Sequence, residues 1–285
     1  MLDYRVTSAC RVTDSAERDA WTLPTLISLC CRALVRSKQC VPDVVVSTMP
    51  ARVRAMLLHF AVSQGSFQVF DYMTCALSSG VTEIRLHGSG VNDFGIGMLS
   101  RSCGQYLIRV NLSHCTHLRD AGVVGLVRQC PQLRALDLSH CRLTDTAFTS
   151  AARCCCELRE LDCSWNGSGV GERSMYAIAS CCLRLESLAL CGCQLRDDVL
   201  VTLAKSCTRL SHLHIRGCGL LTEPGFVTAL CSLSHICNLE LCAFPHISEP
   251  SLQVPPFTCL CAAPCTHTDV AITHSPMLCK RLQSS

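Results

Sequence analysis

The chain has few aromatic residues, little excess charge of either sign and no long apolar run. Aromatic side chains make up 5% of the 285 residues, and 25 Lys and Arg against 22 Asp and Glu give a formal net charge of +3. A nearly neutral chain offers no general electrostatic attraction to nucleic acid or to an anionic membrane surface. No stretch reaches the roughly 18 consecutive apolar residues of a membrane span. We therefore expect neither a nucleic-acid nor a membrane partner.

Catalytic motifs and a secretory leader are missing too. The sequence has no glycine-rich phosphate loop, no G-x-S-x-G elbow and no H-E-x-x-H motif. Residues 1–20 lack the basic start and apolar run of a secretory signal. We expect a protein that is not an enzyme, has no cofactor, and works in the cytoplasm, the nucleus or both.

A repeated pattern fills the middle of the chain. The unit LRALDLSHCRLTDTAFTSAARCC, from Leu133 to Cys155, recurs with steps of 26, 26, 25, 27, 25 and 26 residues when aligned on its first apolar residue. A period of this length headed by L-x-x-L-x-L-x-x-[NC] is the signature of a leucine-rich repeat. The seven aligned positions are Val81, Leu107, Leu133, Leu158, Leu185, Leu210 and Ile236.

Each unit changes its apolar period from that of a strand to that of a helix. Leu136 and Leu138 alternate with Asp137, which predicts a short strand with the leucines facing inward. Thr144-Asp145 then open a helix whose Phe148 and Ala151 share one face. Because one strand and one helix cannot bury these faces alone, the copies must stack. We predict an α/β leucine-rich-repeat solenoid, a horseshoe with parallel strands on the concave face and helices on the convex face.

Two further columns follow the same register. An acidic residue that can complement the helix dipole and cap free backbone donors begins each helix: Asp93, Asp120, Asp145, Glu172, Asp197, Glu223 and Glu249. An inward turn position after each strand holds a small thiol or an amide: Cys115, Cys141, Asn166, Cys193 and Cys218.

The 26 cysteines would suggest a disulfide scaffold in a small secreted protein. Here they recur at fixed places in the repeat, which indicates core packing. Those at the helix ends are Cys103, Cys130, Cys155, Cys182, Cys207 and Cys231. We predict that both columns are buried and reduced, as in an intracellular protein. The run Cys154-Cys155-Cys156 is interpreted in the same way, as buried packing and not redox chemistry, because no C-x-x-C accompanies it.

Four segments follow from composition and register. Residues 1–20 are polar and form a flexible lead, 21–78 form a helical cap, 79–254 form the solenoid, and 255–285 form an irregular, disordered tail that begins after Pro255 and Pro256 end the last helix. Within the cap, Arg52 and Arg54 are expected on the polar side of a helix over residues 51–62. The tail holds Cys259, Cys261, Cys265, His267, His274 and Cys279, whose spacing fits no standard zinc finger, so no metal site is expected.

The strand register also gives the side chains on the concave face. An acidic middle lies between two basic ends, and the candidate partner-binding residues are Arg85, Arg109, Asn111, Asp137, Glu160, Asp162, Trp165, His212, His214 and Arg216. Just past the strands, a rim column holds His114, His140, Trp165, Gly192 and Gly217. Trp165 is a natural anchor for a partner. The alternative is that it only covers a neighbouring turn.

In units such as CTHLRDAGVVGLVRQCPQLRALDLSHCRLTDTAF the chain resembles the cysteine-containing repeats of F-box proteins. LISLCCRALV and MPARVRAMLLHFAVSQG, which run into the repeats from Val81, make it similar to the antagonist of mitotic exit network family over residues 23–247. The pattern of an F-box itself, LP-x2-[VIL]-L-x2-[IL]-F with a distal Trp, is not present.

The resemblance implies protein binding without catalysis. Relatives with an F-box deliver substrates to an SCF ubiquitin ligase, and the fungal namesake opposes a mitotic-exit GTPase. We therefore expect a monomeric module that binds a protein on its concave face, with Skp and cullin subunits or a mitotic-exit GTPase as candidate partners. Its role would be that of a substrate receptor or adaptor in ubiquitin-dependent cell-cycle control. The alternative is a stoichiometric inhibitor that sequesters a signalling enzyme or GTPase.

Overall fold

Strands and helices alternate along the part of the chain that the computed structural model describes, which comprises residues 49–50, 53–54, 57, 81–233 and 235–240. The strands are β1 (Glu83–Arg85), β2 (Arg109–Asn111), β3 (Ala135–Asp137), β4 (Glu160–Asp162), β5 (Ser187–Ala189), β6 (His212–His214) and β7 (Asn238–Glu240). The helices are α6 (Asp93–Cys103), α7 (Asp120–Gln129), α8 (Asp145–Cys154), α9 (Glu172–Cys181), α10 (Asp197–Ser206) and α11 (Glu223–Leu230). Short 3-10 turns, η1 (Gly104–Tyr106) and η2 (Gly167–Gly169), complete the described elements.

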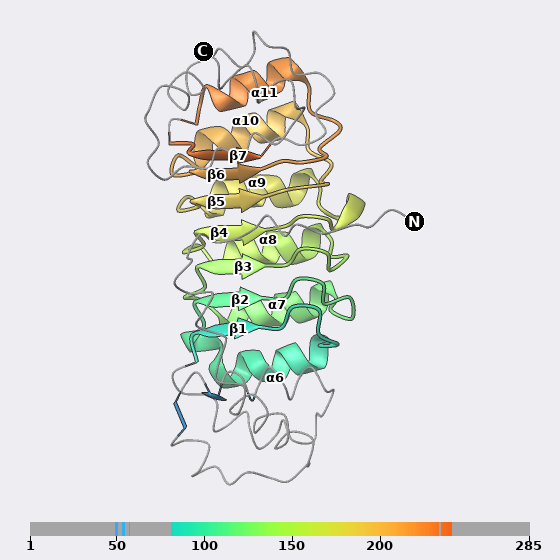
Figure 1. Cartoon of the computed structure of the whole chain (residues 1–285), viewed down its shortest axis with the longest axis vertical. Helices are drawn as coiled ribbons and strands as arrows, with labels where there is room; N and C mark the ends of the chain where they lie inside the picture. The colour runs from blue at the N-terminus through green and yellow to red at the C-terminus, as the bar shows by residue number, and fades with distance from the viewer. Residues whose placement is uncertain (1–48, 51–52, 55–56, 58–80, 234, 241–285) are drawn as a thin grey trace, which may run out of the picture.

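The described strands form one parallel sheet in the order of the sequence, from β1 to β7. The helices stack in the same order behind the sheet (Figure 1). Each residue pairs with its equivalent in the next repeat, so Val110 lies beside Leu136, and Leu136 beside Leu161. The predicted α/β leucine-rich-repeat solenoid and its register are therefore confirmed.

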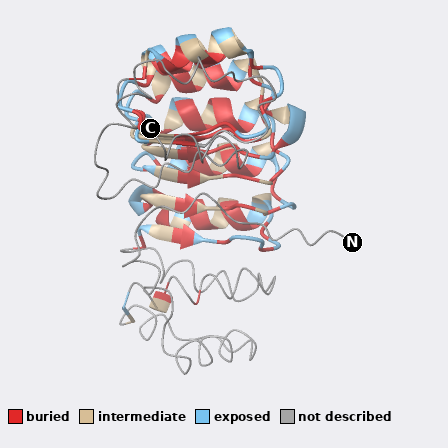
Figure 2. Ribbon diagram, turned by 45° about the horizontal axis from the view of Figure 1, so that its top comes forward, coloured by how far each residue is buried: buried red, intermediate tan, exposed pale blue. Residues whose placement is uncertain are grey.

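The core lies between the sheet and the helices, where the buried sides of both layers meet (Figure 2). Leu136 at the centre of β3 is 2% exposed, and Leu143 in the following loop is 1% exposed. Phe148 of α8 is fully buried. Removing one such side chain from water stabilises the fold by about 1.5–3 kcal/mol. The change of apolar period in each unit thus sets which side of each element faces the core.

The acidic column does begin each helix, but its aspartates reach across to the next repeat. Asp120, the first residue of α7, accepts hydrogen bonds from the backbone N–H of Thr144 at 2.9 Å and from its hydroxyl at 2.6 Å. Asp197 does the same for Thr222, at 2.8 and 2.5 Å. Each of these bonds connects the start of one helix to the start of its neighbour. Glu172 instead forms an ion pair with Arg196 at 3.2 Å.

Two helix positions require glycine because these aspartates lie against them. The repeat pattern of the sequence does not predict this requirement. A Cβ on Gly122 of α7 would lie 2.4 Å from Oδ1 of Asp93, and one on Gly225 of α11 would lie 2.0 Å from Cγ of Asp197. Any larger residue would displace the carboxylate from the helix start that it caps.

The turn-column residues link consecutive repeats. The thiols of Cys115, Cys141 and Cys218 donate, at 3.0–3.2 Å, to the carbonyl of the residue that directly follows the strand of the preceding repeat. Asn166 makes the same contact, donating to the carbonyl of Leu138 at 2.9 Å. Its amide oxygen also accepts from the backbone N–H groups of Cys141 and Leu143.

The helix-end cysteines are buried at Cys103, Cys130, Cys155, Cys182 and Cys207, but the prediction is wrong for Cys231, which is exposed. In the repeats of α7 to α10 this cysteine lies three residues before the leucine that starts the next unit, and in that of α6 it lies four residues before it. In the last described repeat that place belongs to Leu233, which is 2% exposed. Helix α11 has 8 residues where α10 has 10, so Cys231 comes two residues before the core position.

The cysteine run at the end of α8 is only partly buried. Cys155 lies in the core and Cys154 is half-buried, but Cys156 is exposed, so burial of the whole run is a wrong prediction. The helix ends at Cys154, and neighbouring residues at its end face different directions. One thiol therefore fills the core position while the next lies at the surface.

Several predictions fall wholly or mostly outside the described residues. They are the lead 1–20, the cap 21–78, the tail 255–285 with its Cys and His residues, Glu249 and the double proline. In the cap, Val53, Arg54 and Leu57 are described and helical. Arg54 is 8% exposed, which contradicts its expected place on the polar side. It lies three residues from Leu57, so both share the face that packs on the core.

No helix within the described residues is long and apolar enough to span a membrane.

Candidate protein-binding face

The sheet brings the candidate residues into columns on its concave side. Arg109, Ala135 and Glu160 occupy equivalent positions in β2, β3 and β4, and Asn111, Asp137 and Asp162 form the next column. His212 and His214 lie on β6, followed by Arg216. Arg85 on β1 and Arg216 after β6 lie about five strand spacings apart, roughly 24 Å. They cannot contact the same small group.

The basic residues near the start of the sheet are already paired. Arg85 contacts Glu83 at 2.6 Å on its own strand. Arg109 reaches Glu160 at 3.3 Å, two strands away, and the intervening Ala135 is short enough to allow it. Both pairs are partly exposed, so their contribution to stability is small. Their main effect is to cancel the charge of the expected basic end and of Glu160.

Asp137 and Asp162 have a structural role that the sequence pattern did not reveal. Oδ1 of Asp137 accepts from the backbone N–H of Ser139 at 3.0 Å, and Oδ1 of Asp162 accepts from that of Ser164 at 2.8 Å. Asn111 makes the equivalent contact with the N–H of Ser113 at 3.1 Å. This local bond ends each strand and starts the turn. Either a carboxylate or an amide can therefore fill the column.

The two carboxylates lie close enough to influence each other. Burial, and then the charge of Asp162, raise the pKa of Asp137 to about 6. Among the described residues, the ion pairs involve neither aspartate. Asp137 does accept a hydrogen bond from the amide of Asn111 at 2.9 Å. Asp162 is 9% exposed, and His214 two strands further on is 6% exposed, so these two lie deeper in the face than their outward register predicts.

The rim column adopts a left-handed backbone in every described repeat from β1 to β6. The φ angles of His114, His140 and Trp165 are 60°, 57° and 59°. The glycines at the equivalent places, Gly88, Gly192 and Gly217, have φ angles of 64° to 71°. Glycine adopts this conformation without strain, whereas other residues are destabilised by about 1 kcal/mol. Three aromatic residues thus stand where glycine would be the stable choice.

Their rings form one continuous row, which we call the rim strip: His87, His114, His140 and Trp165. His114 and His140 stack with ring centroids 4.1 Å apart, His87 meets His114 edge-on at 5.0 Å, and His140 stacks on Trp165 at 6.0 Å. Burial and the neighbouring His114 lower the pKa of His87 and of His140. The strip is therefore uncharged at neutral pH at those two positions.

Trp165 extends along the solenoid over the next repeats. A Cβ on Gly192 would lie 2.7 Å from its six-membered ring, and one on Gly217 would lie 3.8 Å from the far end of the ring. The side chain therefore covers the neighbouring turn, as the alternative interpretation proposed. Yet the residue remains 45% exposed. It can cover a turn and still present a surface to a partner.

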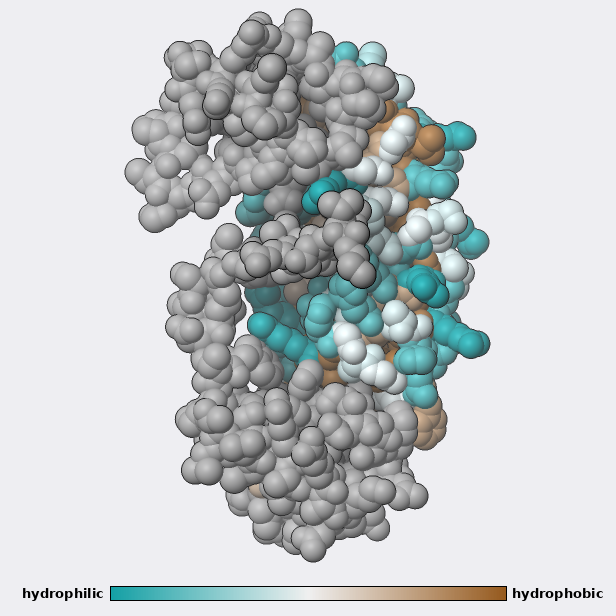
Figure 3. Space-filling view, turned by 45° about the vertical axis from the view of Figure 1, so that its right-hand side comes forward, coloured by the Kyte–Doolittle hydropathy of each residue, from teal (hydrophilic) through white to brown (hydrophobic). Residues whose placement is uncertain are grey.

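The other large exposed apolar residues are scattered over different repeats: Phe94, Tyr106, Tyr176, Leu183 and Leu220. In the edge view of Figure 3, hydrophilic side chains alternate with small apolar areas. Single exposed apolar residues are normal on a soluble protein surface. Trp165 differs from them because it continues a row of stacked rings.

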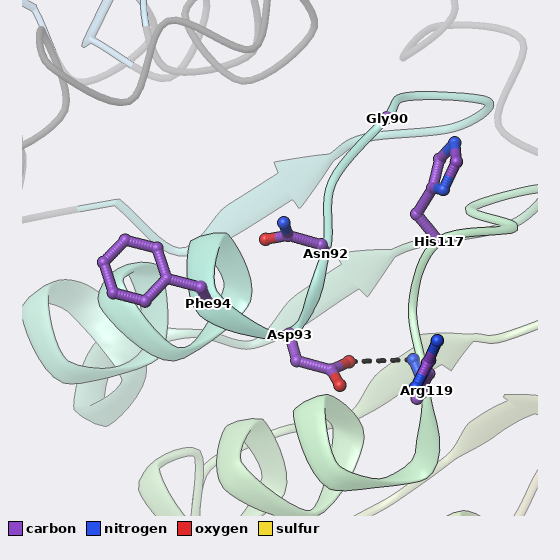
Figure 4. Close-up of a pocket in the computed structure, with 6 residues that line it drawn as sticks. All are labelled: Gly90, Asn92, Asp93, Phe94, His117 and Arg119. Atoms are coloured by element: carbon purple, nitrogen blue, oxygen red, sulfur yellow. Dashed lines mark hydrogen bonds between the residues drawn. The ribbon is translucent and has the colours of Figure 1, made fainter.

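A separate pocket lies at the start of α6, lined by Gly90, Asn92, Asp93, Phe94, His117 and Arg119 (Figure 4). Asp93 points across it and accepts a hydrogen bond from the backbone N–H of Arg119 at 2.8 Å. That contact belongs to the helix-start connections described above. Within the described ranges, no group of three or more His, Cys, Asp or Glu residues could hold a metal ion.

The sequence predicts that most residues of the rim strip share one repeat position, but not how their side chains are arranged. The column His114, His140 and Trp165 was found, but neither the stacking of its rings nor the place of His87 was predicted. The signal that could have shown the backbone conformation is the glycine at Gly192 and Gly217, because a repeat position that accepts glycine often requires a positive φ. The repeat period does not determine the orientation of an aromatic side chain.

Comparison with known proteins agrees on the class. A family model described as Leucine Rich repeat matches residues 129–147. This match and the sheet of parallel strands alternating with helices define the chain as a leucine-rich-repeat protein. No curated protein sequence matches it.

Two solved structures show a similar arrangement at low identity. One is in the crystal structure of the Rad7 and Elc1 complex in yeast, with 16% identity, a TM-score of 0.45, and 80% of this chain and 64% of that chain covered. The other is in the TLR13–ssRNA13 complex, with 18% identity, a TM-score of 0.40, and 59% and 23% covered. The chain thus spans less than two thirds of the length of either.

Proposed function

We propose that this leucine-rich-repeat protein is a non-catalytic binding module that recognises a protein partner on its concave face and the adjoining rim strip. Its cellular role would be that of a substrate receptor or adaptor of an SCF-type ubiquitin ligase, acting in cell-cycle control. The second part rests on the resemblance of residues 23–247 to the mitotic-exit antagonists and F-box proteins. Skp and cullin subunits are then the candidate partners.

The observation that carries the binding role is the strained and partly exposed row of rings, which lies beside two aspartates that form no ion pair with other described residues. His114, His140 and Trp165, one in each of three consecutive repeats, have a left-handed backbone that destabilises the fold relative to glycine. The rings are therefore retained for a reason other than stability. Trp is among the residues that most often dominate binding energy at protein interfaces.

A stoichiometric inhibitor that sequesters a signalling enzyme or a mitotic-exit GTPase is the second candidate. It uses the same face and differs only in the partner. Affinity purification of the full chain followed by mass spectrometry separates the two. Recovery of Skp and cullin subunits supports the receptor, and recovery of a GTPase or enzyme without them supports the inhibitor.

The purified partner then tests the face itself. Trp165→Ala should weaken binding by about 2 kcal/mol, since it removes the exposed anchor. Arg128→Ala is the matched control, because Arg128 is exposed on the convex helix α7. If Trp165→Ala binds the partner as tightly as wild type does, recognition lies elsewhere and the proposal fails.

A further inference from the structure

The rim strip and the pair of aspartates, Asp137 and Asp162, lie next to each other along two consecutive repeats. Asp137 and Asp162 end β3 and β4, and His140 and Trp165 follow each of them by three residues. The charge of Asp162 acts on the ring of His140, which places the carboxylate within electrostatic range of the strip. One partner segment crossing this region would contact rings and carboxylates together.

The charge of this region is not balanced within the described part of the chain. Arg109 is engaged by Glu160, and Arg85 by Glu83, so neither neutralises the aspartates. Asp137 and Asp162 instead raise each other's energy as neighbouring anions. A positive group from a partner would remove that repulsion, whereas an acidic partner would add to it. Charge complementarity therefore selects a basic occupant.

The geometry of the surface selects among basic groups. A guanidinium is planar, lies against aromatic rings, and can donate to a carboxylate at the same time. An ammonium is a compact, strongly hydrated charge that does not stack. A row of rings flanked by carboxylates therefore fits a guanidinium better than an ammonium.

We propose that the rim strip around Trp165, together with Asp162 and Asp137, binds an extended partner segment through an arginine that lies against the Trp165 indole and donates hydrogen bonds to the carboxylate of Asp162. The inference rests on the proposed function, since it names the chemistry of the partner for the same face. It requires no side chain to leave its place in the turn, because only Oδ1 of Asp162 accepts from Ser164, and among the described residues Oδ2 accepts no hydrogen bond.

The test uses the full chain and short Gly/Ser peptides that carry arginine, lysine or citrulline at the same positions. Binding is followed by the indole N–H signal of Trp165 in an NMR spectrum, assigned with Trp165→Phe; Trp21 supplies the other indole signal. The arginine peptide should shift the Trp165 signal saturably, with about tenfold weaker binding for the lysine peptide and none for citrulline.

The variant Asp162→Asn isolates the charge. It keeps the oxygen that accepts from Ser164, as Asn111 does in its own repeat, so the turn remains and the fold is retained. Arginine-peptide binding should fall about tenfold in Asp162→Asn. In Arg128→Ala it should be unchanged. Equal binding of the arginine and citrulline peptides, or full binding by Asp162→Asn, would overturn the inference.

The captured partner distinguishes this failure from that of the proposed function. If the partner depends on Trp165 but the arginine peptide produces no saturable shift, the face binds protein by other chemistry, and only the arginine inference is lost. If neither the binding of the partner nor the binding of the peptide depends on Trp165, both the proposed function and the arginine inference are wrong. An arginine in the partner whose replacement by lysine weakens the complex about tenfold, in wild type but not in Asp162→Asn, supports the inference directly.

Discussion

At the scale of single residues, Asp137 does two things that oppose each other. Its Oδ1 fixes the turn after β3, and its second oxygen accepts from Asn111, both of which favour the carboxylate. Burial and the charge of Asp162 disfavour it more strongly, so its pKa rises to about 6. A neutral residue with the same shape would keep the turn and lose the repulsion.

Asp137→Asn should therefore stabilise the protein at neutral pH, by about 1–2 kcal/mol once partial exposure is allowed for. Because the folded-state pKa lies above the unfolded value of about 3.9, the wild-type contribution is fully present below pH ~4 and is lost as the pH rises through about 6. The difference between variant and wild type should appear over that window. Urea unfolding at a series of pH values measures it.

The reciprocal change is the control. Asn111→Asp adds a third carboxylate to the column and removes the amide donor to Asp137, so it should destabilise the protein at neutral pH by on the order of 1 kcal/mol. Equal stabilities for wild type and Asp137→Asn across the window would show that the two aspartates do not repel each other in the folded protein.

At the scale of elements, the helix starts show that the repeats are connected through side chains as well as through the sheet. Asp120 holds both the N–H and the hydroxyl of Thr144, which is the N-cap of α8. Asp120→Ala should destabilise the protein by about 1 kcal/mol, within the range for the loss of a helix cap. Asp198→Ala, a substitution in the first turn of α10, is the comparison, because among the described residues the Asp198 carboxylate accepts a hydrogen bond only from the hydroxyl of Tyr176.

Hydrogen exchange locates the effect of the Asp120 substitution. Amides in the first turn of α8 should exchange faster in Asp120→Ala, whereas those of α10 should not change. Uniform acceleration over all helices would mean that the carboxylate acts on global stability and not as a local connection between α7 and α8.

The sequence was sufficient for the elements and insufficient for their contacts. The apolar positions of LRALDLSHCRLTDTAF predict strand, loop and helix, because burial alternates with a period that the residue types reveal directly. The same letters could not show that Asp120 caps the helix after its own, since that depends on how far one repeat is displaced from the next. Nor could they place Cys231 at the surface, because α11 is two residues shorter than α10 and the core position belongs to Leu233.

At the scale of the whole molecule, the buried thiols make the solenoid sensitive to alkaline pH. Burial raises the pKa of Cys103, Cys141, Cys155 and Cys218 to about 12 and that of Cys207 to about 11. These raised values mean that the thiols contribute stability that is fully present below the unfolded pKa of about 9 and is lost as the pH rises toward 11–12.

The free energy of unfolding should thus fall by on the order of 1 kcal/mol for each buried thiol and each pH unit above about 9. Chemical unfolding at pH values on both sides of 9 measures the slope. A free energy that stays constant from neutral pH to about pH 10 would be incompatible with a thiol core.

Native thiol labelling tests the same packing one cysteine at a time. Among the described cysteines, Cys156, Cys231 and Cys237 are exposed, whereas the turn-column and other helix-end thiols are buried. A brief treatment of the native protein with iodoacetamide should modify these three, because a buried thiol is both shielded and protonated at neutral pH. Peptide mapping by mass spectrometry identifies the sites, and the same treatment in denaturant should modify the buried set as well. If Cys130 or Cys182 reacts as fast as Cys156 in the native protein, or if mapping finds disulfides between repeats, the periodic cysteines do not form the core that their spacing predicts.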